Sequence, residues 1–225
     1  MRLLIATRNA HKVAEIRAIL GPAFEYLTLR DFSGAPEAIE DAPTFEGNAA
    51  KKAATLASWL SSQNQADTLV LADDSGLEVD ALNGAPGVHS ARFAALDDTG
   101  FAPGKNSPDR ANNEKLLRLL AEIPEEKRVA RFRCALALIA VPISPASVDA
   151  LAATARFFSG ACEGRIAFAP SGNGGFGYDP LFIPVGHERS FAELGEDVKN
   201  RMSHRAKALN ELRKHFVGGA SSASP

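Results

Sequence analysis

The sequence predicts an α/β protein with a central mixed β-sheet flanked by helices. Apolar runs of strand length recur along the 225-residue chain, and amphipathic segments of helix length lie between them. The two kinds of segment do not alternate strictly, which favours a mixed sheet over an all-parallel one. A glycine-rich stretch near residues 170–180 divides the pattern. We therefore expect two lobes with the active site in the cleft between them.

Each element follows from a local pattern. Asn9 is a good N-cap for a helix that ends near residues 21–22, and Pro124 stops a later helix. Buried strands are predicted from continuous apolar runs, and the strand at 77–82 from alternation. The predicted strands are 2–8, 24–32, 68–73, 77–82, 128–141, 154–168 and a short strand that ends near 184. The further predicted helices are 48–63, 110–123 and, in two pieces, 190–216.

Composition limits the class of protein. The net charge of −2 gives no reason to expect a nucleic-acid or membrane partner. No signal peptide and no apolar run of membrane-spanning length is visible, and the two cysteines, Cys134 and Cys162, fit buried reduced thiols. We expect a cytoplasmic protein with a single two-lobed domain over residues 1–217, a surface loop near 97–110 and a disordered tail at 218–225.

The first helix carries an anomaly at its start. Lys12 lies in the first turn after Asn9, where the helix dipole disfavours a cation. Backbone amides at a helix N-terminus bind anions, and a lysine adds a full charge. Lys12 therefore either faces a negative ligand or simply points into water.

Two adjacent acids follow a predicted strand. Asp73 and Asp74 precede Ser75 and Gly76 in "LADDSG", at the carboxyl end where ligands bind in α/β sheets. Because successive strand residues point to opposite faces, one aspartate should face the cleft, and the other the second side or a turn. Carboxylates together with phosphate are the ligands of Mg²⁺. The alternative is a polar turn.

Three further stretches contain candidate residues. The loop "SGNGGFGYDP" places Phe176 and Tyr178 among glycines, which suits a flat ligand, with Asp179 as an acceptor. Ser203 is a candidate N-cap that puts His204 and Arg205 in a first turn. The alternative for the glycine-rich stretch is a flexible loop. The alternative for His204 and Arg205 is that basic residues occur in this first turn by chance. The acidic loop before residue 48 is either a solvated loop or a source of a metal ligand; its acids are Glu37, Glu40, Asp41 and Glu46.

In their order along the chain, four of these stretches resemble the motifs of the inosine triphosphate pyrophosphatase family. They are "TRNAHK", "ADDSGLEVDALNGAPGVHSARF", "GGFGYDPLF" and "SHRAKAL". The resemblance covers residues 2–216. It implies an elongated α/β fold, a homodimer and Mg²⁺-dependent hydrolysis of ITP, dITP and XTP to the monophosphate and pyrophosphate.

The resemblance also implies roles for individual residues. Asp74 would be the general base and a metal ligand, Glu40 a second metal ligand, and Lys52 a further lysine in the site. The substrate-binding residues would be Thr7, Arg8, Asn9, Ala10, His11, Lys12, Ser75, Phe176, Gly177, Tyr178, Asp179, Lys199, His204 and Arg205. Of these, Lys12 would contact the triphosphate. Lys199, His204 and Arg205 would recognise the base.

These roles lead to a mechanistic hypothesis. Asp74, or a metal-bound water that it orients, activates the water that attacks the α-phosphorus. Lys12 and Lys52 stabilise charge on the phosphate oxygens. His204 and Arg205 can donate to a 6-keto oxygen, whereas the 6-amino group of adenine would leave those donors unpaired.

The sequence departs from the family pattern at three places. Gly47 stands where many members have Glu, Arg8 stands where Gly is frequent, and the connection over residues 97–113 is long. Two other functions stay open: a related pyrophosphatase for other modified or pyrimidine triphosphates, and a non-catalytic nucleotide-binding module. A nucleic-acid-binding module is disfavoured because there is no basic stripe.

Overall fold

The computed structural model describes residues 1–97 and 106–219. Its strands form one six-stranded sheet in the order β2-β1-β3-β4-β5-β6. The sheet is mixed, because β1 pairs parallel with β2 and β3 whereas β5 pairs antiparallel with β6. The predicted α/β class with a central mixed sheet is therefore confirmed.

The predicted strands and helices occur in the predicted order along the chain. The strands are β1 (Arg2–Ile5), β2 (Glu25–Thr28), β3 (Thr68–Val79), β4 (Val129–Ala140), β5 (Arg156–Ile166) and β6 (Phe182–Pro184). The α-helices are α1 (Ala10–Leu20), α2 (Phe45–Ser62), α3 (Asp109–Leu119), α4 (Val148–Ala152), α5 (Phe191–Leu194), α6 (Glu196–Met202) and α7 (His204–Gly219). Short 3-10 helices are η1 (Gly21–Ala23), η2 (Asp80–Leu82), η3 (Gly87–Arg92), η4 (Ala94–Asp97) and η5 (Glu125–Lys127). None of the helices within these described ranges has the length and apolar character needed to cross a membrane.

Several boundaries differ from prediction. Helix α2 begins three residues before residue 48, because the side chain of Thr44 caps it by accepting a hydrogen bond from the Gly47 amide at 3.1 Å. The C-terminal helical region has three pieces, since Gly195 at φ +81° separates α5 from α6. Helix α7 includes residues 218 and 219 of the predicted tail. The rest of that tail, and residues 98–105 of the predicted surface loop, lie outside the described residues.

The main correction concerns β3. The sequence predicted two separate strands, 68–73 and 77–82, with a polar turn after the first as an alternative, but Thr68–Val79 is one strand and both aspartates lie in its interior. The alternation of side chains between the two faces continues through the acidic pair. The carboxylates have cationic partners on both faces, and these partners offset the free-energy cost of burying two charges in a strand.

The chain divides into two compact units, each made of separate segments. The first consists of Met1–Asp74, Cys134–Gly160 and Arg205–Pro225, and the second of Ser75–Arg133 and Ala161–His204. The single-domain boundary at residue 217 stays a prediction.

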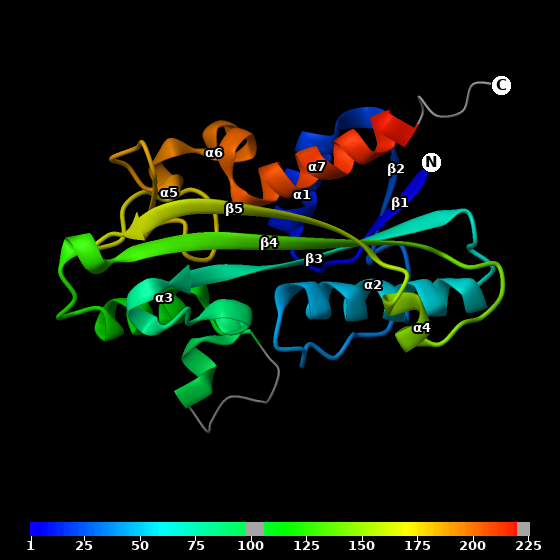
Figure 1. Cartoon of the computed structure of the whole chain (residues 1–225), viewed down its shortest axis with the longest axis horizontal. Helices are drawn as coiled ribbons and strands as arrows, with labels where there is room; N and C mark the ends of the chain where they lie inside the picture. Colours follow the sequence, from blue (N-terminus) through cyan, green and yellow to red (C-terminus); the bar gives the residue numbers. More distant parts are fainter. Residues whose placement is uncertain (98–105, 220–225) are drawn as a thin grey trace. The chain divides into compact units, whose positions relative to one another are not determined.

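In the first unit, helices cover both faces of the strands. Leu4 and Val70 belong to an apolar cluster with α2 and α4, whereas Leu3, Ile5 and Leu71 pack with α1 and α7. Figure 1 shows α2 and α4 on one side of these strands and α1 and α7 on the other. Alternate residues of β1 and β3 thus face different helices, and the same alternation decides where their polar residues point.

The second unit has an aromatic core. The rings of Phe132, Phe182 and Phe191 lie within 4.6 to 6.3 Å of one another, between centroids. Leu116 and Leu120, at the C-terminal end of α3, pack into the same cluster. Asn113 of α3 donates to the Gly177 carbonyl at 3.0 Å, so α3 lies next to the glycine-rich loop that precedes β6.

Candidate active site

The first wall of the candidate site is the N-terminus of α1. Asn9 caps it as predicted, because its side-chain oxygen accepts hydrogen bonds from the amides of His11 at 2.9 Å and Lys12 at 3.2 Å. The Asn9 amide in turn donates to the hydroxyl of Thr7 at 3.1 Å. Helix α1 then begins at Ala10. The cap holds the segment from Thr7 to Lys12 in one conformation. It engages only backbone amides, so the Lys12 ammonium can pair with an anion elsewhere.

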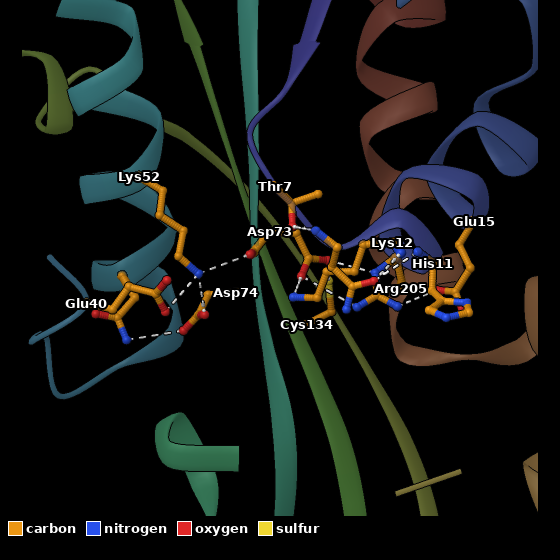
Figure 2. Close-up of polar contacts among 12 residues, drawn as sticks. Thr7, His11, Lys12, Glu15, Glu40, Lys52, Asp73, Asp74, Cys134 and Arg205 are labelled. Atoms are coloured by element: carbon orange, nitrogen blue, oxygen red, sulfur yellow. Dashed lines mark hydrogen bonds and ion pairs between the residues drawn. The ribbon is translucent and has the colours of Figure 1, made fainter. Parts of the chain in front are cut away.

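That anion is Asp73. The Lys12 ammonium donates to Asp73 Oδ1, and Arg205 Nε donates to Asp73 Oδ2 at 2.8 Å. Cys134 Sγ lies 3.3 Å from Asp73 Oδ2, and Arg205 Nη1 donates to Glu15. Figure 2 shows these five residues, which we call the Asp73 cluster, gathered between α1 and β3. The first-turn cation is thus explained within the protein.

The Asp73 cluster stabilises the charged form of its central carboxylate. Its side chain is 1% exposed, and burial alone would raise its pKa, but the charges of Arg205 and Lys12 lower the pKa well below its ordinary value. Two cations face two carboxylates, Asp73 and Glu15, so the formal charges balance. Both oxygens of Asp73 accept hydrogen bonds from cationic side chains, which stabilises its charged form.

Asp74 points to the opposite face of β3, toward α2. Its Oδ1 accepts from Lys52 Nζ at 2.8 Å, and its Oδ2 accepts from Asn48 Nδ2 at 3.2 Å. Lys52 Nζ also lies 3.0 Å from Glu40, and the Asn48 side-chain oxygen accepts from the Ala42 amide at 2.9 Å. We call Glu40, Asn48, Lys52 and Asp74 the Asp74 cluster, of which Figure 2 labels Glu40, Lys52 and Asp74. Of the two possibilities that the sequence left open for the second aspartate, a turn or the second side of the strand, the structure shows the second.

The Asp74 cluster differs from the Asp73 cluster in its electrostatics. Burial raises the pKa of Asp74 above its ordinary value, although Lys52 and Lys12 oppose this shift. Burial also disfavours the charged form of Lys52, but the carboxylates of Asp74 and Glu40 raise its pKa overall. Asp74 is therefore a carboxylate that can accept a proton more readily than an exposed aspartate.

The Asp74 cluster also suits a divalent cation. Carboxylate oxygens of Glu40 and Asp74 both lie within 3.0 Å of the Lys52 ammonium, so they converge on one centre of positive charge. Hard oxygen donors of this kind, with phosphate and water, are what Mg²⁺ binds. The described residues contain no group of three or more His, Cys, Asp or Glu side chains that could hold a metal by themselves.

The departures at Arg8 and Gly47 both concern the acidic loop. Arg8 Nε lies 3.2 Å from Glu37, and both side chains are largely exposed. A Cβ added at Gly47 would lie only 2.7 Å from the Cβ of Ala42. The loop thus passes too close to α2 for a side chain at 47, and it is the neighbouring Asn48 that ties the loop to Asp74.

The glycine-rich loop of the second unit forms a separate polar cluster. Asp179 Oδ2 accepts from the Phe176 amide at 2.8 Å and from Lys199 Nζ at 2.6 Å. The Lys199 ammonium also lies 4.2 Å from the centre of the Phe176 ring. The structure thus brings three predicted base-pocket residues together, and a buried lysine links the aromatic ring to the acid.

Other predicted base-pocket residues contact core residues or charged side chains of the protein itself. Tyr178 is 4% exposed, and its hydroxyl donates to the Ser90 carbonyl at 2.9 Å, so its ring belongs to the core. His204 is buried and stacks on Phe132 with centroids 4.8 Å apart. The guanidinium of Arg205 faces the carboxylates of the Asp73 cluster. The base-recognition role of His204 and Arg205 stays a prediction, as does the substrate contact of Ser75.

Sequence reasoning missed two residues of these clusters. Glu15 lies three residues after Lys12 and beside the apolar Ile16, so an acid on the buried face of an amphipathic helix was the available signal. Asn48 lies in the first turn of α2 and is fully buried, but nothing in its local pattern distinguishes it from an exposed asparagine.

Comparisons with known proteins show which family the chain is similar to. A model described as the Ham1 family matches residues 3–215. The chain is 46% identical over 219 residues to a protein of Opitutus terrae named dITP/XTP pyrophosphatase, covering 94% of this chain and 97% of that one. A protein of the same name from Geobacter sulfurreducens is 46% identical over 217 residues, covering 96% of both chains. The solved structure of the Staphylococcus aureus Ham1 protein has a TM-score of 0.77 and 33% identity, covering 97% of this chain and all (100%) of that one.

Proposed function

Because this chain belongs to the Ham1 family, we propose that it is a dITP/XTP pyrophosphatase, which hydrolyses non-standard purine nucleoside triphosphates to the monophosphate and pyrophosphate. The observation that carries the proposal is the Asp74 cluster. A buried carboxylate with a raised pKa lies beside a lysine and a second carboxylate, which are the groups that water activation next to a phosphate chain requires.

Mg²⁺ is part of this proposal. Glu40 and Asp74 would hold it, since their oxygens already converge on a cation. The ion, when bound, would neutralise charge on the triphosphate. Because the protein offers two carboxylates, phosphate oxygens and water would complete the shell.

The residues of the first unit divide the work on the phosphates. Asp74 accepts the proton of the attacking water, for which its raised pKa suits it. Lys52, held between the two carboxylates, donates to the phosphate oxygens as negative charge develops on them. Lys12 adds a second ammonium, fixed by Asp73 and 15% exposed, and the capped segment from Thr7 presents the adjacent backbone.

In the second unit, the purine is recognised by the glycine-rich loop. The ring of Phe176 offers a stacking surface, and Lys199 and Asp179 offer a donor and an acceptor. His204 and Arg205, the other predicted base-recognising residues, would select a 6-keto group. Adenine presents an amino group there and would leave buried donors unpaired, which costs binding free energy. We further propose a cytoplasmic homodimer without a nucleic-acid or membrane partner.

The test is pyrophosphate release from dITP, XTP, dATP and dGTP with Mg²⁺. We expect dITP and XTP to be cleaved much faster than dATP, and we expect a chelator to stop the reaction. Cleavage of dATP at the rate of dITP would contradict the selection of the 6-keto group. Preference for a pyrimidine triphosphate would indicate a related pyrophosphatase, and binding without turnover would indicate a nucleotide-binding module.

A further inference from the structure

Helix α3 holds both peptide groups of one residue in the glycine-rich loop. The amide of Gly177 donates to Asp109 Oδ2 at 2.7 Å, and its carbonyl accepts from Asn113 Nδ2 at 3.0 Å. Asp109 and Asn113 are four residues apart and therefore lie on one face of the helix. They come from a part of the chain more than sixty residues away from the loop and have no role in the proposed chemistry.

Gly177 is the point at which this grip affects the pocket most. It has φ +62°, a conformation that glycine adopts without strain, and it separates Phe176 from Tyr178 and Asp179. Phe176 is tied to Asp179 at 2.8 Å, and Tyr178 is tied to the core through its hydroxyl. Rotation of the Gly177 peptide would move the aromatic ring relative to the acid.

Helix α3 is itself anchored on a neighbouring face. The Asn112 side chain accepts from the Ala94 amide at 2.8 Å and donates to the Ala91 carbonyl at 3.3 Å. Lys115 Nζ donates to the Phe93 carbonyl at 2.7 Å. These bonds fix the helix to η3 and η4, so the two side chains that reach Gly177 start from a rigid base.

The chemistry of Asn113 points away from a purely stabilising role. Its side chain is mostly buried, and within the described residues its Oδ1 has no hydrogen-bond partner. A buried unpaired acceptor costs free energy, which offsets what the bond to Gly177 contributes. Gly177 is only partly buried, so water could replace that bond. The gain from Asn113 is therefore in geometry.

We infer that Asp109 and Asn113 are positioning residues for purine selection, because they hold the Gly177 peptide so that Phe176 and Asp179 keep their places. The inference rests on the proposed function, since it assigns this loop to the purine. Neither residue touches the reacting atoms. Their removal should therefore affect substrate affinity and selectivity more than the chemical step.

The experiment compares Asn113→Leu, Asp109→Ala and Asp109→Asn with wild type, using kcat and KM for dITP and dGTP with Mg²⁺. Asn113→Leu and Asp109→Ala should raise KM for dITP about tenfold, change kcat by less than about threefold, and lower the preference for dITP over dGTP. Asp109→Asn keeps an acceptor for the Gly177 amide and should restore most of the affinity. Glu114→Ala is the matched control, because it removes an exposed ion pair from the same helix.

Thermal unfolding and amide hydrogen exchange complete the test. Faster exchange over residues 175–179 in Asn113→Leu and Asp109→Ala, with an unchanged Tm for Asn113→Leu, is the expected result. Wild-type KM and selectivity in folded Asn113→Leu would overturn the inference. A fall in both kcat and Tm without a change in KM would overturn it as well. A wild-type protein inactive on dITP would instead overturn the proposed function, and unchanged exchange would then refute the positioning role independently.

Discussion

The adjacent aspartates of β3 should respond in opposite ways to the same substitution. Asp73→Asn removes the charge that Lys12 and Arg205 both face, whereas Asp74→Asn removes the proposed base. The two side chains are next to each other in sequence, are both buried and become the same amide. The comparison therefore isolates their surroundings as the cause of any difference.

The stability cost can be worked from the contacts. Removing one partner of a buried ion pair costs about 3–5 kcal/mol. Asn at 73 keeps one acceptor oxygen, and Arg205 keeps its contact with Glu15, so we expect the lower end, about 3 kcal/mol. For a chain of this size, that corresponds to a fall in Tm of roughly 6–12 °C.

Asp74→Asn should change stability much less. Burial raises the pKa of Asp74, so its charged form is disfavoured there, and Lys52 retains Glu40 as a partner at 3.0 Å. We expect a change below about 1 kcal/mol in the free energy of unfolding, together with a loss of pyrophosphate release of about 100- to 10,000-fold.

The assay is thermal unfolding by circular dichroism, followed by pyrophosphate release from dITP by each folded variant. The reasoning is refuted if Asp73→Asn is as stable as Asp74→Asn. It is also refuted if Asp74→Asn retains wild-type turnover, because another residue must then accept the proton.

Three other substitutions test separate parts of the site. Gly175→Ala would place a Cβ 2.1 Å from Asp179 Oδ2 at φ +73°, so it should lower the unfolding free energy by about 1–2 kcal/mol and also raise KM for dITP. Gly47→Glu would press on Ala42, so it should cost about 1–3 kcal/mol and raise the Mg²⁺ concentration needed for half-maximal activity. Arg8→Ala should change stability by less than about 0.5 kcal/mol, because its ion pair is exposed, while KM for dITP rises about two- to fivefold.

Each of these has a measurement that would contradict it. Gly186→Ala is the control for Gly175→Ala, since residue 186 has φ +82° but open space around its Cβ position, and it should leave KM unchanged. A lower Mg²⁺ concentration for half-maximal activity in Gly47→Glu would contradict the second prediction, because it would show that an acid at position 47 helps to bind the ion. An unchanged KM in Arg8→Ala would remove Arg8 from the phosphate-binding segment.

Local patterns were sufficient for most of the fold. The Asn9 cap, the end of α1 and the existence of the apolar strands follow from residue preferences within a few positions, and these predictions were confirmed. The helix predicted to run to Pro124 ends instead at Leu119. The prediction that the strand ends at "DDSG" was wrong. Asp, Ser and Gly favour turns locally, and only the cations on both faces of β3 allow the strand to continue.

The sequence by itself identified Asp73 and Asp74 as adjacent acids that follow a buried strand, and the two-residue period of a strand puts them on opposite faces if the strand continues. Only the tertiary structure decided what each one meets. Arg205 reaches Asp73 across 132 positions of sequence, and Asn113 reaches Gly177 across 64. Such partners depend on how distant segments pack, which no local pattern encodes. That packing makes one aspartate a fixed anion and leaves the other with the raised pKa of a proton acceptor.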